Sequence, residues 1–148
     1  MVWFLLWAGA GQIYRSTNEG LTFEPLDFNI SVYTGGQGYS CISVSPNFEN
    51  DNVVFLLAGS TGGYTIFKSI NSGNDFYPVH ETTISGSDRE STEFYFLDDY
   101  VDEGTVFLTS HFGYYQSNDF GETWIEKESP DFFGDSHAGQ YHSGLIGA

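Results

Sequence analysis

The sequence predicts an all-β protein made of repeated antiparallel sheets, and three observations support this fold class. Short runs of alternating apolar and polar residues follow one another along the chain, as is typical of strands. Glycine accounts for 18 of the 148 residues, so the chain turns often. One eight-residue pattern also occurs three times at nearly equal spacing. A period of roughly 50 residues indicates a repeat architecture.

The repeated pattern reads Ser-x-(Asn/Asp)-x-Gly-x-x-aromatic. Its three copies, here named the turn repeats, begin 53 and 48 residues apart and span Ser16–Phe23, Ser69–Phe76 and Ser117–Trp124. An apolar segment precedes each copy, and its phenylalanine recurs at intervals of 51 and 52 residues as Phe4, Phe55 and Phe107. Two features that stay in register over three copies indicate three equivalent structural units.

Each turn repeat predicts a hairpin turn. We expect the Asn or Asp side chain to accept a backbone N–H bond two residues on, and the glycine to supply a positive φ. The final aromatic residue is expected to begin the return strand and to lie in the core, together with the upstream phenylalanines. The residues expected to build the turns are Ser16, Asn18, Gly20 and Phe23; Ser69, Asn71, Gly73 and Phe76; and Ser117, Asp119, Gly121 and Trp124.

The turn repeats resemble the Asp-box (bacterial neuraminidase repeat, BNR) family, whose Ser-x-Asp-x-Gly-x-Thr-Trp motif is complete at 117–124. The segment SPNFEND at 45–51 is similar to repeats of bacterial and archaeal surface propellers. The resemblance implies β-propeller blades of the sialidase-like fold, with each box between the third and fourth strands and facing away from the ligand site. The family includes sialidases, xyloglucanases, the luminal domain of sortilin and photosystem II assembly factors, so it implies an architecture rather than an activity.

Alternation and turn residues predict strands of three blades within a single domain, 1–148. The first blade covers 1–27, completed by 140–148, the second covers 39–79 and the third covers 93–127. The expected strands are 2–8, 12–16 and 22–26; 39–45, 53–58, 64–69 and 75–79; 93–98, 105–110, 113–117 and 123–127; and 140–146.

Three blades would leave unpaired edges, whereas propellers close with about four to eight blades. Two alternatives stay open. Two chains may form a homodimer with a six-bladed ring, in which each C-terminal strand completes the first blade of its partner. Alternatively, the chain is a fragment of a longer propeller.

The charge excludes several partners. Four Lys and Arg residues against 20 Asp and Glu give a net charge of −16, so we expect no nucleic-acid binding and no insertion into a membrane. The apolar segment at the N-terminus lacks a basic start and is too short for a signal peptide or a membrane span. The acidic composition favours an extracellular, cell-surface or periplasmic location.

The expected function is a non-catalytic module that binds carbohydrate or protein. A sialidase site needs three arginines, whereas the chain has only Arg15 and Arg89. Two alternatives remain: a glycoside hydrolase fragment or subunit, and an assembly factor that docks on a partner protein. The candidate ligand residues lie in the loops of the expected ligand face, and they are Tyr33, His80, Asp88, Arg89, His111, Phe112 and His137. Tyr114 and Tyr115 are among the aromatic residues that could stack on sugars.

No cofactor is expected, and the one candidate is Ca²⁺, against the alternative of a charged turn on an acidic surface. Four carboxylates gather in the turn of residues 98–104, and hard oxygen ligands at this density suit calcium. They are Asp98, Asp99, Asp102 and Glu103. Cys41 is the only cysteine and lies in an alternating apolar run, which predicts a buried core thiol rather than a nucleophile.

Overall fold

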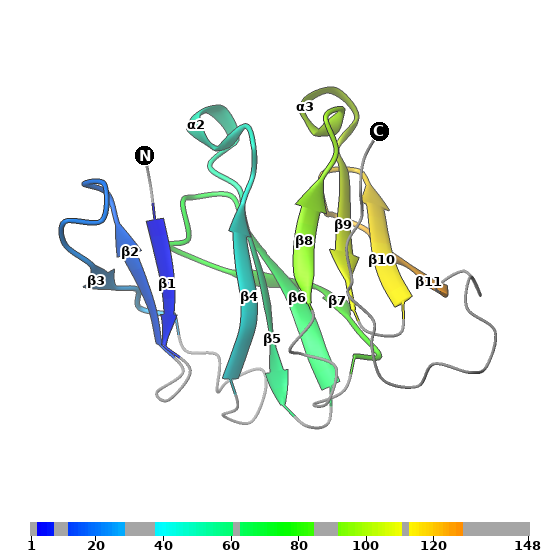
Figure 1. The fold of residues 1–148 in the computed structure, drawn as a ribbon, viewed down its shortest axis with the longest axis horizontal. Coiled ribbons are helices and arrows are strands. Elements are labelled where there is room, and N and C mark those ends of the chain that lie inside the picture. The colour runs from blue at the N-terminus through cyan, green and yellow to red at the C-terminus, as the bar shows by residue number, and fades with distance from the viewer. Residues whose placement is uncertain are drawn as a thin grey trace, which may run out of the picture.

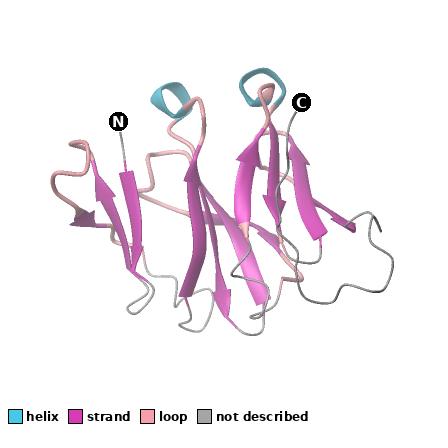
Figure 2. Ribbon diagram, viewed as in Figure 1, coloured by secondary structure: helices cyan, strands magenta, loops and turns pink. Residues whose placement is uncertain are grey.

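The structure is a computed structural model that describes residues 3–7, 12–28, 38–60, 63–84, 92–110 and 113–128. Three antiparallel sheets lie side by side in this part of the chain, with two short helices above them (Figures 1 and 2). The predicted all-β class is therefore confirmed.

Each sheet is built from consecutive strands that pair with their neighbours in sequence. The first sheet contains β1 (Trp3–Trp7), β2 (Gln12–Ser16) and β3 (Glu24–Pro25); the second contains β4 (Gly38–Val44), β5 (Val54–Ser60), β6 (Gly63–Ser69) and β7 (Tyr77–Glu81); the third contains β8 (Glu93–Phe96), β9 (Thr105–Thr109), β10 (Gly113–Asn118) and β11 (Ile125–Glu128). Every strand expected in these ranges is present, and the strand expected at 140–146 lies outside the described residues.

The two helices join the first and second strands of the second and third sheets. They are α2 (Phe48–Asp51) and α3 (Tyr100–Glu103), and each ends at a residue with positive φ, Asn52 or Gly104. Figure 1 shows both helices at one edge of the array, here named the helix edge. The other edge, where β5 ends and β6 begins, is named the opposite edge.

Each helix is tied to the turn repeat of its own sheet. The carbonyl of Asn52 accepts the N–H of Ser72 at 3.0 Å, and the carbonyl of Gly104 accepts the N–H of Phe120 at 3.0 Å. The described part of the first sheet contains no such helix. The helix and the turn repeat therefore form one hydrogen-bonded unit in the second and third sheets.

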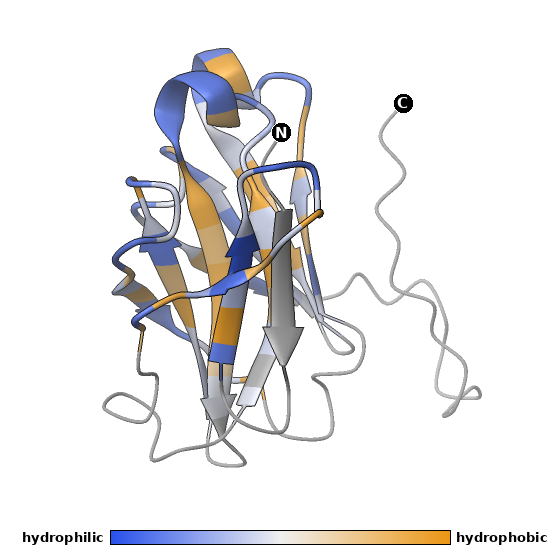
Figure 3. Cartoon of the chain, turned by 90° about the vertical axis from the view of Figure 1, so that its left-hand side faces the viewer, coloured by the Kyte–Doolittle hydropathy of each residue, from blue (hydrophilic) through white to orange (hydrophobic). Residues whose placement is uncertain are grey.

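The core lies in two layers on either side of the second sheet. Val54, Leu56 and Ala58 of β5 belong to the apolar cluster shared with the first sheet. Phe55 and Leu57 belong to the cluster shared with the third sheet. Because alternate residues of a strand point to opposite faces, β5 is buried on both sides. In Figure 3 apolar residues run along the strands, and polar residues predominate in the turns of the helix edge.

Two of the aromatic residues predicted for the core do not lie there. Phe23 is 40% exposed, whereas its counterparts Phe76 and Trp124 are 5% and 6% exposed. Phe107 is half-buried, whereas Phe55 is fully buried. Phe23 and Phe107 belong to the first and the last sheet of the array, so no described sheet covers either of them. The side chain of Phe4 lies outside the described residues.

Candidate functional site

The serine is the residue that organises each turn repeat. Its hydroxyl accepts the backbone N–H of the glycine four residues on, at 2.9 Å for Gly20, 2.9 Å for Gly73 and 2.8 Å for Gly121. The same hydroxyl donates to the Asn or Asp side chain two residues on, at 2.8 to 3.0 Å. The serines are buried, so these bonds satisfy groups that water does not reach.

The Asn or Asp side chain acts differently from the expectation. Its Oδ1 accepts the N–H of the residue four positions on, at 2.9 Å in all three turns, rather than two positions on. The bonding reaches further because two consecutive residues adopt positive φ. Each glycine (φ +80° to +83°) follows a residue that also has positive φ, namely Glu19, Ser72 or Phe120. The predicted positive φ of the glycines is therefore confirmed, and the residue before them was missed.

The second and third sheets meet where a phenylalanine of one sheet packs on the turn of the next. Phe55 contacts Phe94, Phe96 and Trp124, with ring centroids 5.5, 5.9 and 6.0 Å apart. A Cβ on Gly121 would overlap the Phe55 ring. The glycine is therefore required both for its φ and for the space that the ring fills.

A basic side chain supports each junction between sheets. Lys68 of β6 is buried, and its Nζ donates to Glu122 of the third turn repeat at 2.5 Å. Arg15 of β2 donates to the carbonyl of Ser72 at 2.8 Å and to Oδ1 of Asn74 at 2.9 Å. Arg15 and Lys68 both directly precede a turn serine, so the two junctions use the same sequence position for their basic side chain. Arg15 is thus bound in a junction at the helix edge.

Strand register explains why this junction recurs. Ser43, Phe55, Lys68 and Tyr77 pair across the four strands of the second sheet and form one row that faces the third sheet. We name such a row the forward row. The surface that it meets consists of the glycine, the residue after it and the final aromatic of the next turn repeat, and we name it the receiving turn.

Of the seven predicted ligand residues, the structure describes one. His80 lies in β7, paired with Ile66 of β6 toward the opposite edge, and it is half-buried. The other six lie outside the described residues: Tyr33, Asp88, Arg89, His111, Phe112 and His137.

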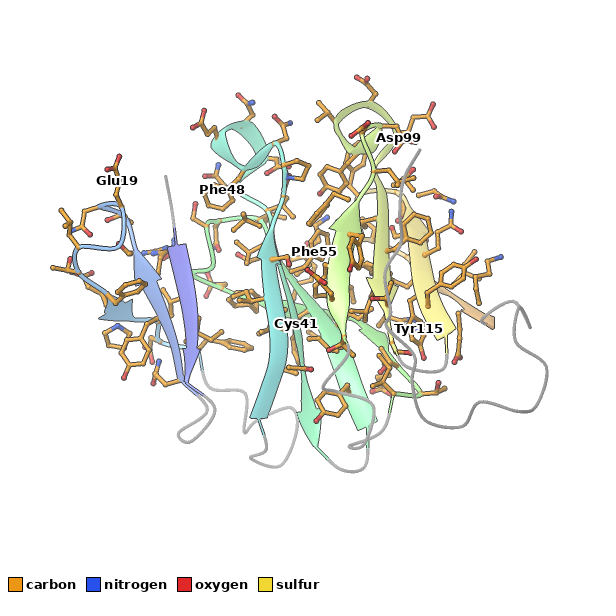
Figure 4. All side chains as sticks on the ribbon, in the orientation of Figure 1. Glu19, Cys41, Phe48, Phe55, Asp99 and Tyr115 are labelled. Atoms are coloured by element: carbon orange, nitrogen blue, oxygen red, sulfur yellow. The ribbon has the colours of Figure 1, made fainter. Side chains whose placement is uncertain are left out.

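A hydrogen-bonded cluster lies beside His80, between the second and third sheets. The hydroxyl of Tyr115 accepts the N–H of Thr83 at 2.9 Å and donates to Oε1 of Glu126 at 3.1 Å. The hydroxyl of Thr83 donates to the same oxygen at 2.6 Å. The ring of His80 packs against that of Tyr115, with centroids 5.5 Å apart. Figure 4 shows Tyr115 on the third sheet.

This cluster holds the two sheets together and is not arranged for nucleophilic chemistry. Tyr115 is only 2% exposed, so it is not a surface for stacking on sugars. Burial raises the pKa of its phenol, and the Glu126 carboxylate raises it further, against the opposing effect of the hydrogen bonds from Thr83. A tyrosine nucleophile needs the opposite shift, because the phenolate is the reactive form.

Sequence reasoning missed the roles of Thr83 and Glu126, which belong to no motif. For Tyr115 a signal existed. Tyr115 and Phe67 both precede a turn serine by two residues, and Phe67 is fully buried between the first and second sheets. The repeat therefore places Tyr115 in a junction.

The four carboxylates considered for calcium surround α3. Asp98, Asp102 and Glu103 are exposed and Asp99 is half-buried, with its Oδ1 buried and without a hydrogen-bond partner. Figure 4 shows Asp99 at the helix edge. Within the described residues, no three His, Cys, Asp or Glu side chains lie close enough to hold a metal ion. Calcium binding here stays a prediction.

Cys41 packs against the core between the second and third sheets as predicted, but it is partly rather than fully buried. Burial raises the pKa of its thiol to about 12, against a lowering effect of its hydrogen bond with Thr92. A thiol with this pKa is almost entirely protonated at neutral pH and reacts slowly.

Comparison with known proteins places the chain in no family: no family model matches the sequence, and no curated protein matches it. Among the described residues, no helix is both long enough and apolar enough to cross a membrane.

Proposed function

We propose that the chain is an arc of three β-propeller blades that acts as a non-catalytic binding module outside the cell or at its surface. The junction between sheets supports this most directly. In both junctions a turn repeat binds a basic side chain of the preceding sheet: Arg15 binds the second turn repeat and Lys68 binds the third. Sheets that stack through one repeated contact form a rigid scaffold, which suits a binding surface.

The described chemistry also favours binding over catalysis. The polar cluster at the opposite edge consists of groups that satisfy one another, and its tyrosine has a raised pKa. The ligand would be a carbohydrate or a protein, held at the opposite edge near His80. The net charge of −16 suits a protein that stays soluble in a saline extracellular medium.

The proposal is tested with an array of neutral and acidic oligosaccharides and labelled protein. Glu81 and Glu103 provide a matched pair, because both are exposed glutamates. Glu81 lies toward the opposite edge and Glu103 lies at the helix edge. We expect Glu81→Ala to weaken binding severalfold and Glu103→Ala to leave it unchanged. The same oligosaccharides should release no new reducing ends.

Two results would contradict this function. Release of reducing ends would favour the hydrolase alternative. An effect of Glu103→Ala without an effect of Glu81→Ala would place the ligand at the helix edge. Absence of binding to every oligosaccharide would exclude carbohydrate and leave a protein as the ligand.

A further inference from the structure

The two ends of the array carry the two halves of the junction that joins its sheets. On the third sheet, register aligns Tyr95, Phe107, Gln116 and Ile125 into a forward row equivalent to that of Phe55. On the first sheet, Gly20, Leu21 and Phe23 form a receiving turn equivalent to Gly121, Glu122 and Trp124. In the described residues, neither half meets its counterpart.

The receiving turn of the first sheet has open space at the position where the Phe55 ring packs on the receiving turn of the third sheet. A Cβ on Gly121 would overlap the Phe55 ring, whereas a Cβ on Gly20 would have nothing within 4 Å. The two glycines share the same backbone conformation, with φ of +82° and +83°. Leu21 is 83% exposed and Phe23 is 40% exposed, so apolar surface surrounds this open space.

The forward row of the third sheet presents the missing ring. Phe107 is half-buried and its described aromatic neighbour is Tyr114 of the same sheet, at 5.8 Å. Phe55, at the equivalent position, packs on three rings of the next sheet or its turn. Ile125 at the end of the row is 57% exposed. The row therefore offers partly exposed apolar side chains at the positions by which the second sheet meets its receiving turn.

We propose that a second copy of this chain covers both ends. The forward row of each copy, centred on Phe107, packs on Gly20, Leu21 and Phe23 of the other. Each contact joins two different surfaces, and a two-fold rotation closes such contacts into a ring of two chains. Six sheets fall within the range in which propellers close. This inference rests on the blade arrangement proposed above and does not depend on any ligand.

One feature distinguishes the contact between copies from those within the chain. The Lys68 position is Gln116 in the third sheet, and the Glu122 position is Leu21 in the first. The contact between copies thus lacks the ion pair and relies on apolar packing. Added salt should strengthen this contact, because both chains carry a charge of −16 and repel each other. At 0.15 M salt this repulsion is screened beyond about 8 Å.

The test is the mass in solution by light scattering across a concentration series, in 0.15 M and 0.5 M salt. We expect a species of about 33 kDa, twice the chain mass of 16.5 kDa. Gly20→Ala introduces a methyl group where the chain itself has room, so within the chain it costs only the strain of a positive φ, whereas across the contact it displaces the partner's Phe107 ring. We expect its dimer dissociation constant to rise roughly tenfold or more.

A second substitution separates this effect from strain at the positive φ of Gly20. Phe107→Leu removes ring atoms whose counterparts in Phe55 lie nearest Gly121. The double variant Gly20→Ala with Phe107→Leu should therefore dimerise more tightly than Gly20→Ala alone. Gln116→Lys with Leu21→Glu copies the Lys68–Glu122 pair and should tighten the dimer in a salt-sensitive way. Circular dichroism confirms that each variant is folded.

A wild-type monomer at all concentrations, or species larger than a dimer, would overturn the inference. A dimer that is insensitive to Gly20→Ala would overturn it as well. Oligosaccharide binding is measured separately, so a monomer that still binds would refute the ring without refuting the binding function.

Discussion

The hydroxyl of Ser117 provides the sharpest test of the turn repeats, through the substitution Ser117→Ala. This hydroxyl accepts the buried N–H of Gly121 at 2.8 Å and donates to Oδ1 of Asp119 at 2.8 Å. Alanine removes both bonds and leaves the Gly121 N–H without a partner. An unpaired buried donor costs about 1–3 kcal/mol, so we expect a loss of about 2–3 kcal/mol in the free energy of unfolding.

The assay is urea unfolding of the wild type and the variant at neutral pH, followed by tryptophan fluorescence and circular dichroism. Thr123→Val is a suitable control, because it removes a hydrogen bond to the same Asp119 from an exposed hydroxyl, at 2.6 Å. We expect the control to lose no more than about 1 kcal/mol. A loss below about 0.5 kcal/mol for Ser117→Ala would refute the role given to the serine.

Three further substitutions or treatments test other parts of the structure. Hydrogen bonds from Thr123, Ser117 and Glu122 lower the pKa of Asp119 from 3.8 in spite of desolvation, so its ionised form stabilises the fold above that pH and less as the pH falls. Asp119→Asn should therefore lose less stability on acidification than the wild type; equal acid sensitivity in urea unfolding at pH 3 and pH 7 would contradict this. Glu122→Ala leaves the Lys68 ammonium buried and unpaired and should cost about 1–3 kcal/mol, more than Lys68→Met, and the reverse order would be inconsistent with the junction. Cys41, with a pKa of about 12, should react with a thiol reagent at pH 8 far more slowly than in the unfolded chain, and fast labelling of the native protein would rule out its burial.

The sequence was sufficient to predict the strands and the positions of the turns, although not the full hydrogen bonding within each turn. The spacing of the serines and of Phe55 and Phe107 placed every strand in the described ranges, because turn chemistry and alternation are local properties of a chain. The positive φ of Gly20 and its counterparts followed from the same pattern.

Burial at the ends of the array could not be predicted in this way. Phe23 and Phe76 are equivalent in sequence, yet only Phe76 has a neighbouring sheet to cover it. A repeat pattern reports that a position is apolar and says nothing about which neighbour is present. Non-local pairs such as Thr83 with Glu126 were missed for the same reason, since no local pattern joins residues 43 positions apart.

The loops that carry most of the predicted ligand residues have no repeat and no strand alternation. His80 was the exception, because it lies on a strand and its pairing with Ile66 fixes its position. Its neighbours in space come from another sheet, and so its packing against Tyr115 emerged only from the structure.

The central claim is that the second sheet docks on the third by placing the Phe55 ring over Gly121 of the third turn repeat. A double-mutant cycle on Gly121→Ala and Phe55→Leu tests it directly by urea unfolding. Alone, Gly121→Ala should cost about 1–2 kcal/mol for its positive φ and about 1–3 kcal/mol for its overlap with the ring. Since leucine vacates that space, the double variant should be more stable than the sum of the single losses by about 1–3 kcal/mol. Strictly additive losses would show that Phe55 and Gly121 do not share a contact, and would contradict the account.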